Sequence, residues 1–147
     1  MVKQTRIVII GSGNVATHMA LALDRTADVC CVFSPTPGHA SRLSEKLKAA
    51  SATNDVSSIP DDADLYIVAV KDDAIADVAR SIEITNGIWA HTSGSVPAEV
   101  FEGIKPKYGV FYPLQTFNLT TEVDFSKVPM LVEGNSPVTT ADLIKVA

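Results

Sequence analysis

Short apolar runs alternate along the chain with segments whose apolar residues recur at helical spacing. Residues 6–10 (RIVII) form a continuous β-branched run, as expected of a strand that is covered on both faces. Residues 14–25 instead place Val15, Met19 and Leu23 four positions apart, on one side of a helix. The same patterns predict strands over 6–10, 29–33, 52–53, 65–70, 88–90, 108–112 and 130–132, and helices over 14–25, 38–50, 72–82, 97–101 and 141–147.

This alternation of strands and helices predicts an α/β fold. Short connections favour a doubly wound, mainly parallel sheet with helices on both faces. The last helix, which Thr139 or Thr140 is expected to start, begins close to the end of the sequence. We therefore expect one domain over residues 1–135 and, over 136–147, the start of a helix that leads to a further domain. A terminal helix docked on the first domain is the alternative.

Composition narrows the class of protein. The 147 residues are 46% hydrophobic and 20% charged, which is typical of one globular domain with a core. The net charge of −5 argues against a nucleic-acid-binding or anionic-membrane surface. The apolar run 7–10 is too short for a signal peptide or a membrane span. The adjacent Cys30 and Cys31 would point to opposite faces of a strand, so we expect two free thiols in a reducing cytoplasm.

A glycine-rich loop follows the first predicted strand and opens the first helix. The segment 11–16 reads GSGNVA, which fits the dinucleotide-binding pattern of Rossmann-like folds. Gly11 would allow the tight turn, Gly13 the close approach of a pyrophosphate, and Ala16 the packing of helix on strand. Backbone N–H groups at the helix start would attract the phosphates. A methyltransferase loop is the rival interpretation, but it needs an acidic residue after the second strand, where none stands.

The end of the second strand indicates which dinucleotide binds. An NAD site requires Asp or Glu about 20 residues after the glycines, on the ribose 2′-hydroxyl. No carboxylate occurs between Asp28 and Glu45, and Ser34 stands at the expected place. Hydroxyl groups and cations suit a 2′-phosphate, so we expect NADP rather than NAD. The side chains available to that phosphate are Ser34, Thr36, His39 and Arg42.

Three polar segments, 70–73, 91–97 and 112–117, follow later strands and would share the ligand-binding edge of the sheet. The segment HTSGSVP (91–97) lacks the GxSxG spacing of a serine hydrolase. The scattered histidines have no metal-ligand spacing, so no metal is expected. His91 is the best candidate proton donor and Ser93 the best hydrogen-bond partner for a substrate oxygen. Alternatively, His91 only holds the strand end while Ser95 caps the helix at Pro97.

Other polar residues receive simpler interpretations. Asp72 and Asp73 are expected to cap the helix that follows them. The run of aspartates at 61–64 is expected to form a solvated turn before a strand. His18, four residues after Asn14, is expected on the surface of the first helix.

Taken together, IGSGNVATHMA, DADLYIVAVKDDAI, HTSGSVP and YGVFYPLQTF resemble a bacterial NADP oxidoreductase family. Its members join a Rossmann-like N-terminal domain to a C-terminal helical domain of unknown function, and are similar to the pyrroline-5-carboxylate reductase and 6-phosphogluconate dehydrogenase class. The resemblance implies that 1–135 binds NADP and that 136–147 leads into the helical domain, which often dimerises. One departure is Pro35, which stands where the family usually has arginine.

By position, the resemblance also implies roles for particular residues. Those around the cofactor would be Gly11, Ser12, Gly13, Asn14, Val15, Ser34, Val70, Lys71, Thr92 and Ser95, to which the 2′-phosphate argument above adds Thr36 and Arg42. His91 and Ser93, the catalytic candidates named above, would border the nicotinamide and the substrate, and Tyr112, Pro113 and Gln115 would face the substrate from the opposite wall. The expected function is hydride transfer between NADP(H) and a small carbonyl, imine or alcohol, and the alternative is a non-catalytic NADP-binding module with a regulatory or scaffold role. The expected partner is a small-molecule substrate, with homodimerisation through the helical domain.

Overall fold

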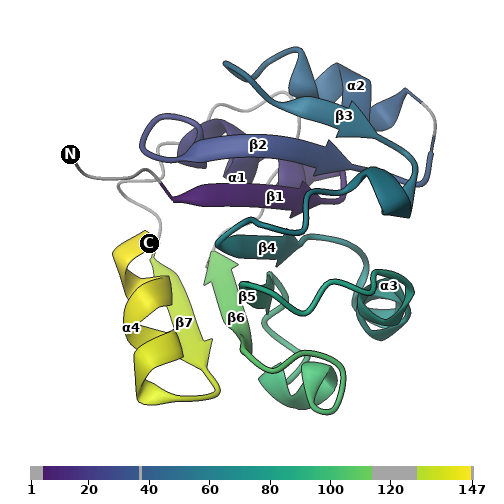
Figure 1. Cartoon of the computed structure of the whole chain (residues 1–147). Helices are drawn as coiled ribbons and strands as arrows, with labels where there is room; N and C mark the ends of the chain where they lie inside the picture. The colour runs from purple at the N-terminus through teal and green to yellow at the C-terminus, as the bar shows by residue number, and fades with distance from the viewer. Residues whose placement is uncertain (1–4, 37, 114–128, 147) are drawn as a thin grey trace.

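A seven-stranded sheet forms the centre of the protein. The structure is a computed structural model that describes residues 5–36, 38–113 and 129–146. The strands lie in the order β3-β2-β1-β4-β5-β6-β7 (Figure 1), and only the edge pair β6–β7 is antiparallel. The strands are β1 (Arg6–Ile10), β2 (Asp28–Phe33), β3 (Ser51–Thr53), β4 (Leu65–Val68), β5 (Ile88–His91), β6 (Tyr108–Pro113) and β7 (Met130–Gly134).

Helices cover both faces of the sheet, as predicted. Apolar residues of α1 (Asn14–Leu23), α2 (His39–Ser44) and α4 (Pro137–Val146) share one core with one face of the sheet. Residues of α3 (Ile75–Ser81) and of the 3-10 helix η3 (Ala98–Phe101) share a second core with the other face. Figure 1 shows α3 and α4 on opposite sides of the sheet. Two further 3-10 turns are η1 (Val56–Ser58) and η2 (Asp72–Ala74). The strand order reverses between β1 and β4, which is where such folds bind dinucleotides.

The second helix is shorter than the prediction of 38–50. It ends at Ser44, and the following N–H groups of Lys46 and Leu47 bond three residues back, as in a 3-10 turn. The buried Asp24 then accepts a hydrogen bond from the Lys48 N–H at 2.9 Å. Because that carboxylate replaces a helical acceptor, the α-helix cannot continue through residue 48.

The last helix begins earlier than predicted. It starts at Pro137 rather than at Thr139 or Thr140, because the Ser136 hydroxyl accepts the Thr139 N–H at 3.1 Å. Serine before a helix and proline in its first position are the usual signals of a helix start. The fully buried Leu143 packs α4 into the core, so this helix is docked on the domain. The further domain after it stays a prediction.

The two cysteines do not separate onto opposite faces of β2, as the strand alternation predicted: Cys31 belongs to the second core and Cys30 packs against the same core. The reason is a register shift in the pairing of β1 with β2, which skips Cys30 and interrupts the alternation. Both thiols are free: Cys31 is buried, and Cys30 is half-buried with its Sγ donating to the Ile7 carbonyl at 3.5 Å. Burial is the main cause that raises the pKa of each thiol, so neither is an activated thiolate. None of the helices in the described residues has the length and apolar character to cross a bilayer.

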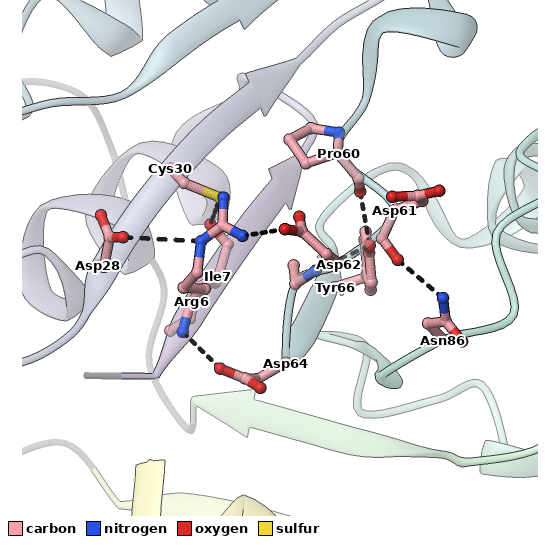
Figure 2. A network of polar contacts seen from close by, with 11 residues as sticks. Arg6, Ile7, Asp28, Cys30, Pro60, Asp61, Asp62, Asp64, Tyr66 and Asn86 are labelled. Atoms are coloured by element: carbon pink, nitrogen blue, oxygen red, sulfur yellow. Dashed lines mark hydrogen bonds and ion pairs between the residues drawn. The ribbon is translucent and has the colours of Figure 1, made fainter. Parts of the chain in front are cut away.

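An ionic network ties the strands together at the edge where β1 and β2 begin (Figure 2). The Arg6 guanidinium pairs with Asp62 at 2.7 Å and lies 3.9 Å from Asp28. The Arg6 backbone N–H donates to the Asp64 carboxylate at 2.9 Å. These contacts raise the pKa of Arg6, with the Asp62 hydrogen bond as the largest cause. The aspartates at 61–64 are thus an exposed turn, but two of them also hold the start of β1.

Candidate cofactor and substrate site

The turn after β1 can only be made by glycine. Gly11 has φ +124°, and a Cβ on it would overlap the Ala69 carbonyl. Its N–H donates to the Phe33 carbonyl at 2.8 Å, while the Ala69 N–H donates to Ile10 at 2.8 Å. The chain therefore needs Gly11 to bring the ends of β1, β2 and β4 together.

Gly13 differs, because the fold itself does not require it. It is the N-cap of α1 with φ −78°, and a Cβ built on it meets nothing within 4 Å. No side chain caps this end of the helix. Exposed N–H groups at a helix start with open space above them suit an anion such as a pyrophosphate. A dinucleotide therefore fits this loop.

A pair of serines joins the glycine loop to the end of β2. The Ser12 hydroxyl donates to the Oγ of the buried Ser34 at 3.2 Å, and the Thr36 N–H reaches the same oxygen at 3.4 Å. Thr36, His39 and Arg42 are exposed beyond it, and no described residue forms an ion pair with Arg42. The described residues of this corner thus offer hydroxyl groups and a guanidinium that pairs with no described carboxylate.

The segment after β4 lies beside the glycine turn. The Val70 Cγ1 is 3.5 Å from the position of a Cβ on Gly11, and Lys71 is exposed at the start of η2. Asp72 does not cap the helix as predicted: its carboxylate accepts a hydrogen bond from the Ser95 hydroxyl at 2.8 Å. That bond is the main cause that lowers the pKa of Asp72. It ties the loop after β4 to the loop after β5.

His91 is fully buried at the end of β5, and both its ring nitrogens have backbone partners. Nδ1 accepts the Ser93 N–H at 3.0 Å, which leaves the Nε2–H to donate to the Pro97 carbonyl at 3.3 Å. Burial is the main cause that lowers the pKa of His91. The ring is therefore neutral near pH 7 and holds the strand end against the segment that follows.

The Ser93 hydroxyl is also occupied inside its own loop. Its Oγ accepts the N–H groups of Ser95 at 3.2 Å and Val96 at 3.3 Å. Because the Ser95 hydroxyl donates to Asp72, the 3.3 Å contact between the two serine oxygens needs Ser93 as its donor. The N-cap of η3 is Pro97 with no side-chain bond, so Ser95 does not cap that helix. The half-buried Thr92 lies between His91 and this turn.

A cavity of about 440 Å³ lies between this loop and the β6–β7 edge. The ring of Tyr112 forms one wall and packs on Gly94: a Cβ there would lie 2.5 Å from the ring. No described residue hydrogen-bonds the Tyr112 hydroxyl. The buried Pro113 is not among the lining residues, and Gln115 lies outside the described residues. The lining consists of Ser93, Gly94, Ser95, Val96, Pro97, Val110, Tyr112, Leu131, Val132 and Glu133.

Comparison with known proteins identifies the family. The family described as NADP oxidoreductase, coenzyme F420-dependent, matches residues 6–91. The chain belongs to this family. A protein from Bacteroides fragilis classed as an NADP oxidoreductase is 40% identical, with a TM-score of 0.90 over 97% of this chain and 56% of that one. The Rossmann-like fold and the glycine-rich loop of the chain are therefore those of an NADP oxidoreductase family.

More distant structures share the fold alone. Arogenate dehydrogenase from Synechocystis is 15% identical with a TM-score of 0.80, and covers 97% of this chain and 55% of that one. Prephenate dehydrogenase from A. aeolicus is 12% identical with a TM-score of 0.77, covering 99% and 55% respectively. No curated protein matches the chain. The chain spans little more than half the length of these structures.

Some features of the site were not predicted from the sequence. Gly94 does not have a positive φ, and its role is to make room for the ring of Tyr112. Leu131 and Glu133 join the cavity because β7 pairs antiparallel with β6, placing them opposite Tyr112 and Val110. The alternation of side chains along a strand could have placed Leu131 and Glu133 on the same face of the sheet. It could not have shown that this face lies against the loop after β5. His18, expected on the surface, is buried in α1.

Packing of Gly94 against Tyr112 predicts a measurable coupling. Gly94→Ala should lower the free energy of unfolding by about 1–2 kcal/mol, because the new methyl group displaces the ring. In a Tyr112→Ala background the same change should cost less than half as much. Thermal or urea unfolding of the four proteins gives this coupling. Equal costs in both backgrounds would contradict the contact.

Proposed function

We propose that the chain is the cofactor-binding part of an NADP-dependent oxidoreductase. The reaction is hydride transfer between NADP(H) and a small carbonyl, imine or alcohol. The observation that carries the proposal is the contrast within the glycine loop: the fold requires Gly11, whereas Gly13 only leaves open space above an uncapped helix start. The family match supports it.

The chain's own residues would orient the cofactor along the edge of the sheet. The loop 11–15 would hold the pyrophosphate, and Ser12 with Ser34 would hold the adenosine ribose. Val70, Lys71, Thr92 and Ser95 would border the nicotinamide. Bound NADPH supplies the hydride, while the protein supplies orientation and excludes water.

We assign positioning roles to the two residues expected to be catalytic. His91 and Ser93 use their polar groups to shape the loop, so a proton passing from either would first break a bond within it. Tyr112 lines the cavity and its hydroxyl has no described hydrogen-bond partner, so it is the better group to meet a substrate oxygen or nitrogen. A further helical domain would complete the site and make a homodimer. The free thiols suit the reducing cytoplasm.

Binding of the cofactor is the first test. NADPH should raise the melting temperature of this chain, because a ligand that binds only the native state stabilises it by mass action. A shift without turnover in a substrate screen on a longer protein would favour the non-catalytic module, whose supporting observation is the closed hydrogen bonding of His91 and Ser93. The absence of any shift at millimolar NADPH would contradict the cofactor site itself.

Selectivity for the 2′-phosphate depends on Arg42. We expect NADPH to bind at least about tenfold more tightly than NADH, since a charge-assisted contact contributes about 1.5 kcal/mol or more. Arg42→Ala should remove most of this preference and leave NADH affinity unchanged. Arg25→Ala, another exposed arginine beyond the far end of α1, is the matched control. Calorimetric titration of the three proteins with both cofactors gives six dissociation constants, and equal affinities of the unaltered chain for NADPH and NADH would contradict the assignment.

A further inference from the structure

The cavity beside β7 combines an apolar floor with an acidic rim. Val96 and Val110 line it together with Leu131, whose side chain is 52% exposed at the edge of the sheet. The volume of about 440 Å³ falls within the range of small-molecule sites. Leu131 therefore offers an exposed apolar surface within the cavity, which an apolar ligand would cover.

The described lining of the cavity carries negative charge and no positive charge. Glu133 lines it, and no described residue pairs with the Glu133 carboxylate. Asp72 lies behind the opposite wall, bonded to Ser95. Burial lowers the pKa of His91, whereas the negative charges of Asp72 and Glu133 raise it. Both carboxylates are therefore close enough to the loop after β5 to act on the same imidazole ring. No lysine or arginine is among the described residues that line the cavity.

This lining discriminates between ligands of equal shape. A carboxylate ligand would face Glu133 with no cation in the described lining to hold it. An ammonium group would instead gain a carboxylate partner and an acceptor at the Tyr112 hydroxyl. We propose that the cavity binds an organic cation, an amine-bearing small molecule whose apolar body lies on Leu131 and Val110 and whose charge faces Glu133. As a substrate class this rests on the proposed function, whereas the binding itself does not.

The test compares three probes of one shape without nicotinamide cofactor. Cyclohexylamine, cyclohexanol and cyclohexanecarboxylate are titrated into the chain with labelled methyl groups, and NMR shifts of Leu131 and Val110 are followed. We expect the amine to bind about two- to fivefold more tightly than the alcohol at low salt, as an exposed ion pair allows, and the carboxylate most weakly. The preference should fall at high salt, which screens exposed charges.

Two variants make the result decisive. Glu133→Gln should bring the amine down to the affinity of the alcohol, and Glu83→Gln, an exposed glutamate away from the cavity, should leave the preference unchanged. Leu131→Asn should weaken all the probes. An amine preference that survives Glu133→Gln, or a carboxylate that binds best, would overturn the proposal. Because NADPH is absent, these outcomes are separate from failure of the cofactor site, which the NADPH titration detects.

Discussion

Gly11→Ala should lose roughly 3–5 kcal/mol of stability, enough to leave little folded protein. The methyl group would be forced into a positive-φ conformation that alanine rarely adopts, and it would overlap the Ala69 carbonyl. Backbone at the end of β4 cannot move away cheaply, because the Ala69 N–H is bonded to Ile10. Circular dichroism and urea unfolding of the purified variant measure the loss.

Gly13→Ala is the matched variant, with the opposite expected result. The new Cβ meets nothing within 4 Å and φ is already negative, so the folded chain accommodates it. Loss of glycine at an N-cap and reduced freedom of the unfolded chain roughly offset each other, within about 1 kcal/mol. A methyl group in the space above the helix start should nevertheless weaken NADPH binding by about tenfold or more.

The pair separates a structural glycine from a binding glycine. The proposal requires Gly11→Ala to act on unfolding and Gly13→Ala on affinity. If Gly13→Ala bound NADPH as tightly as the unaltered chain, the pyrophosphate would not lie over this loop. If Gly13→Ala lost as much stability as Gly11→Ala, the space around a Cβ at position 13 would not be open.

The fold could be predicted because each element carries its own local signal. Apolar runs predicted every strand except β3, whose signal is weak, and the alternation of strands and helices with short connections predicted the doubly wound arrangement. The errors in the prediction lie at helix ends whose positions depend on residues far away in the sequence. Asp24 ends the helical segment near Lys48 from a position 24 residues away, and no local pattern contains that bond.

The sequence was sufficient to predict where the site lies, but not which side chains have polar groups free to act in it. The sequence placed the segments after β1, β2, β4 and β5 at one edge, because parallel strands end together. It could not show that His91 and Ser93 already satisfy their polar groups within their own loop, since that depends on the turn's geometry. Nor could it show Glu133 facing that loop, which depends on the antiparallel pairing of β7.

Lys105 is a buried cation that the sequence did not single out. Its side chain donates to the Ile82 carbonyl at 2.6 Å and to the Ile84 carbonyl at 2.7 Å, just after α3. The ammonium lies 3.8 Å from the centre of the Trp89 ring. Only 4% of the residue is exposed, and burial lowers the pKa of Lys105 to about 8 from 10.5. Lysine here supplies donors for two carbonyls that would otherwise lack them.

Lys105→Met should therefore destabilise the protein by about 2 kcal/mol at pH 7, because methionine fills the space but leaves both carbonyls unpaired. Between pH 8 and 10.5 the unfolded lysine binds more protons than the folded one, so stability from Lys105 rises with pH across that window. The difference between the unaltered chain and Lys105→Met should thus grow by about 2 kcal/mol by pH 10. Urea unfolding at a series of pH values measures it. A difference that stays level or shrinks would mean that the two carbonyls and the Trp89 ring outweigh burial and keep the ammonium charged.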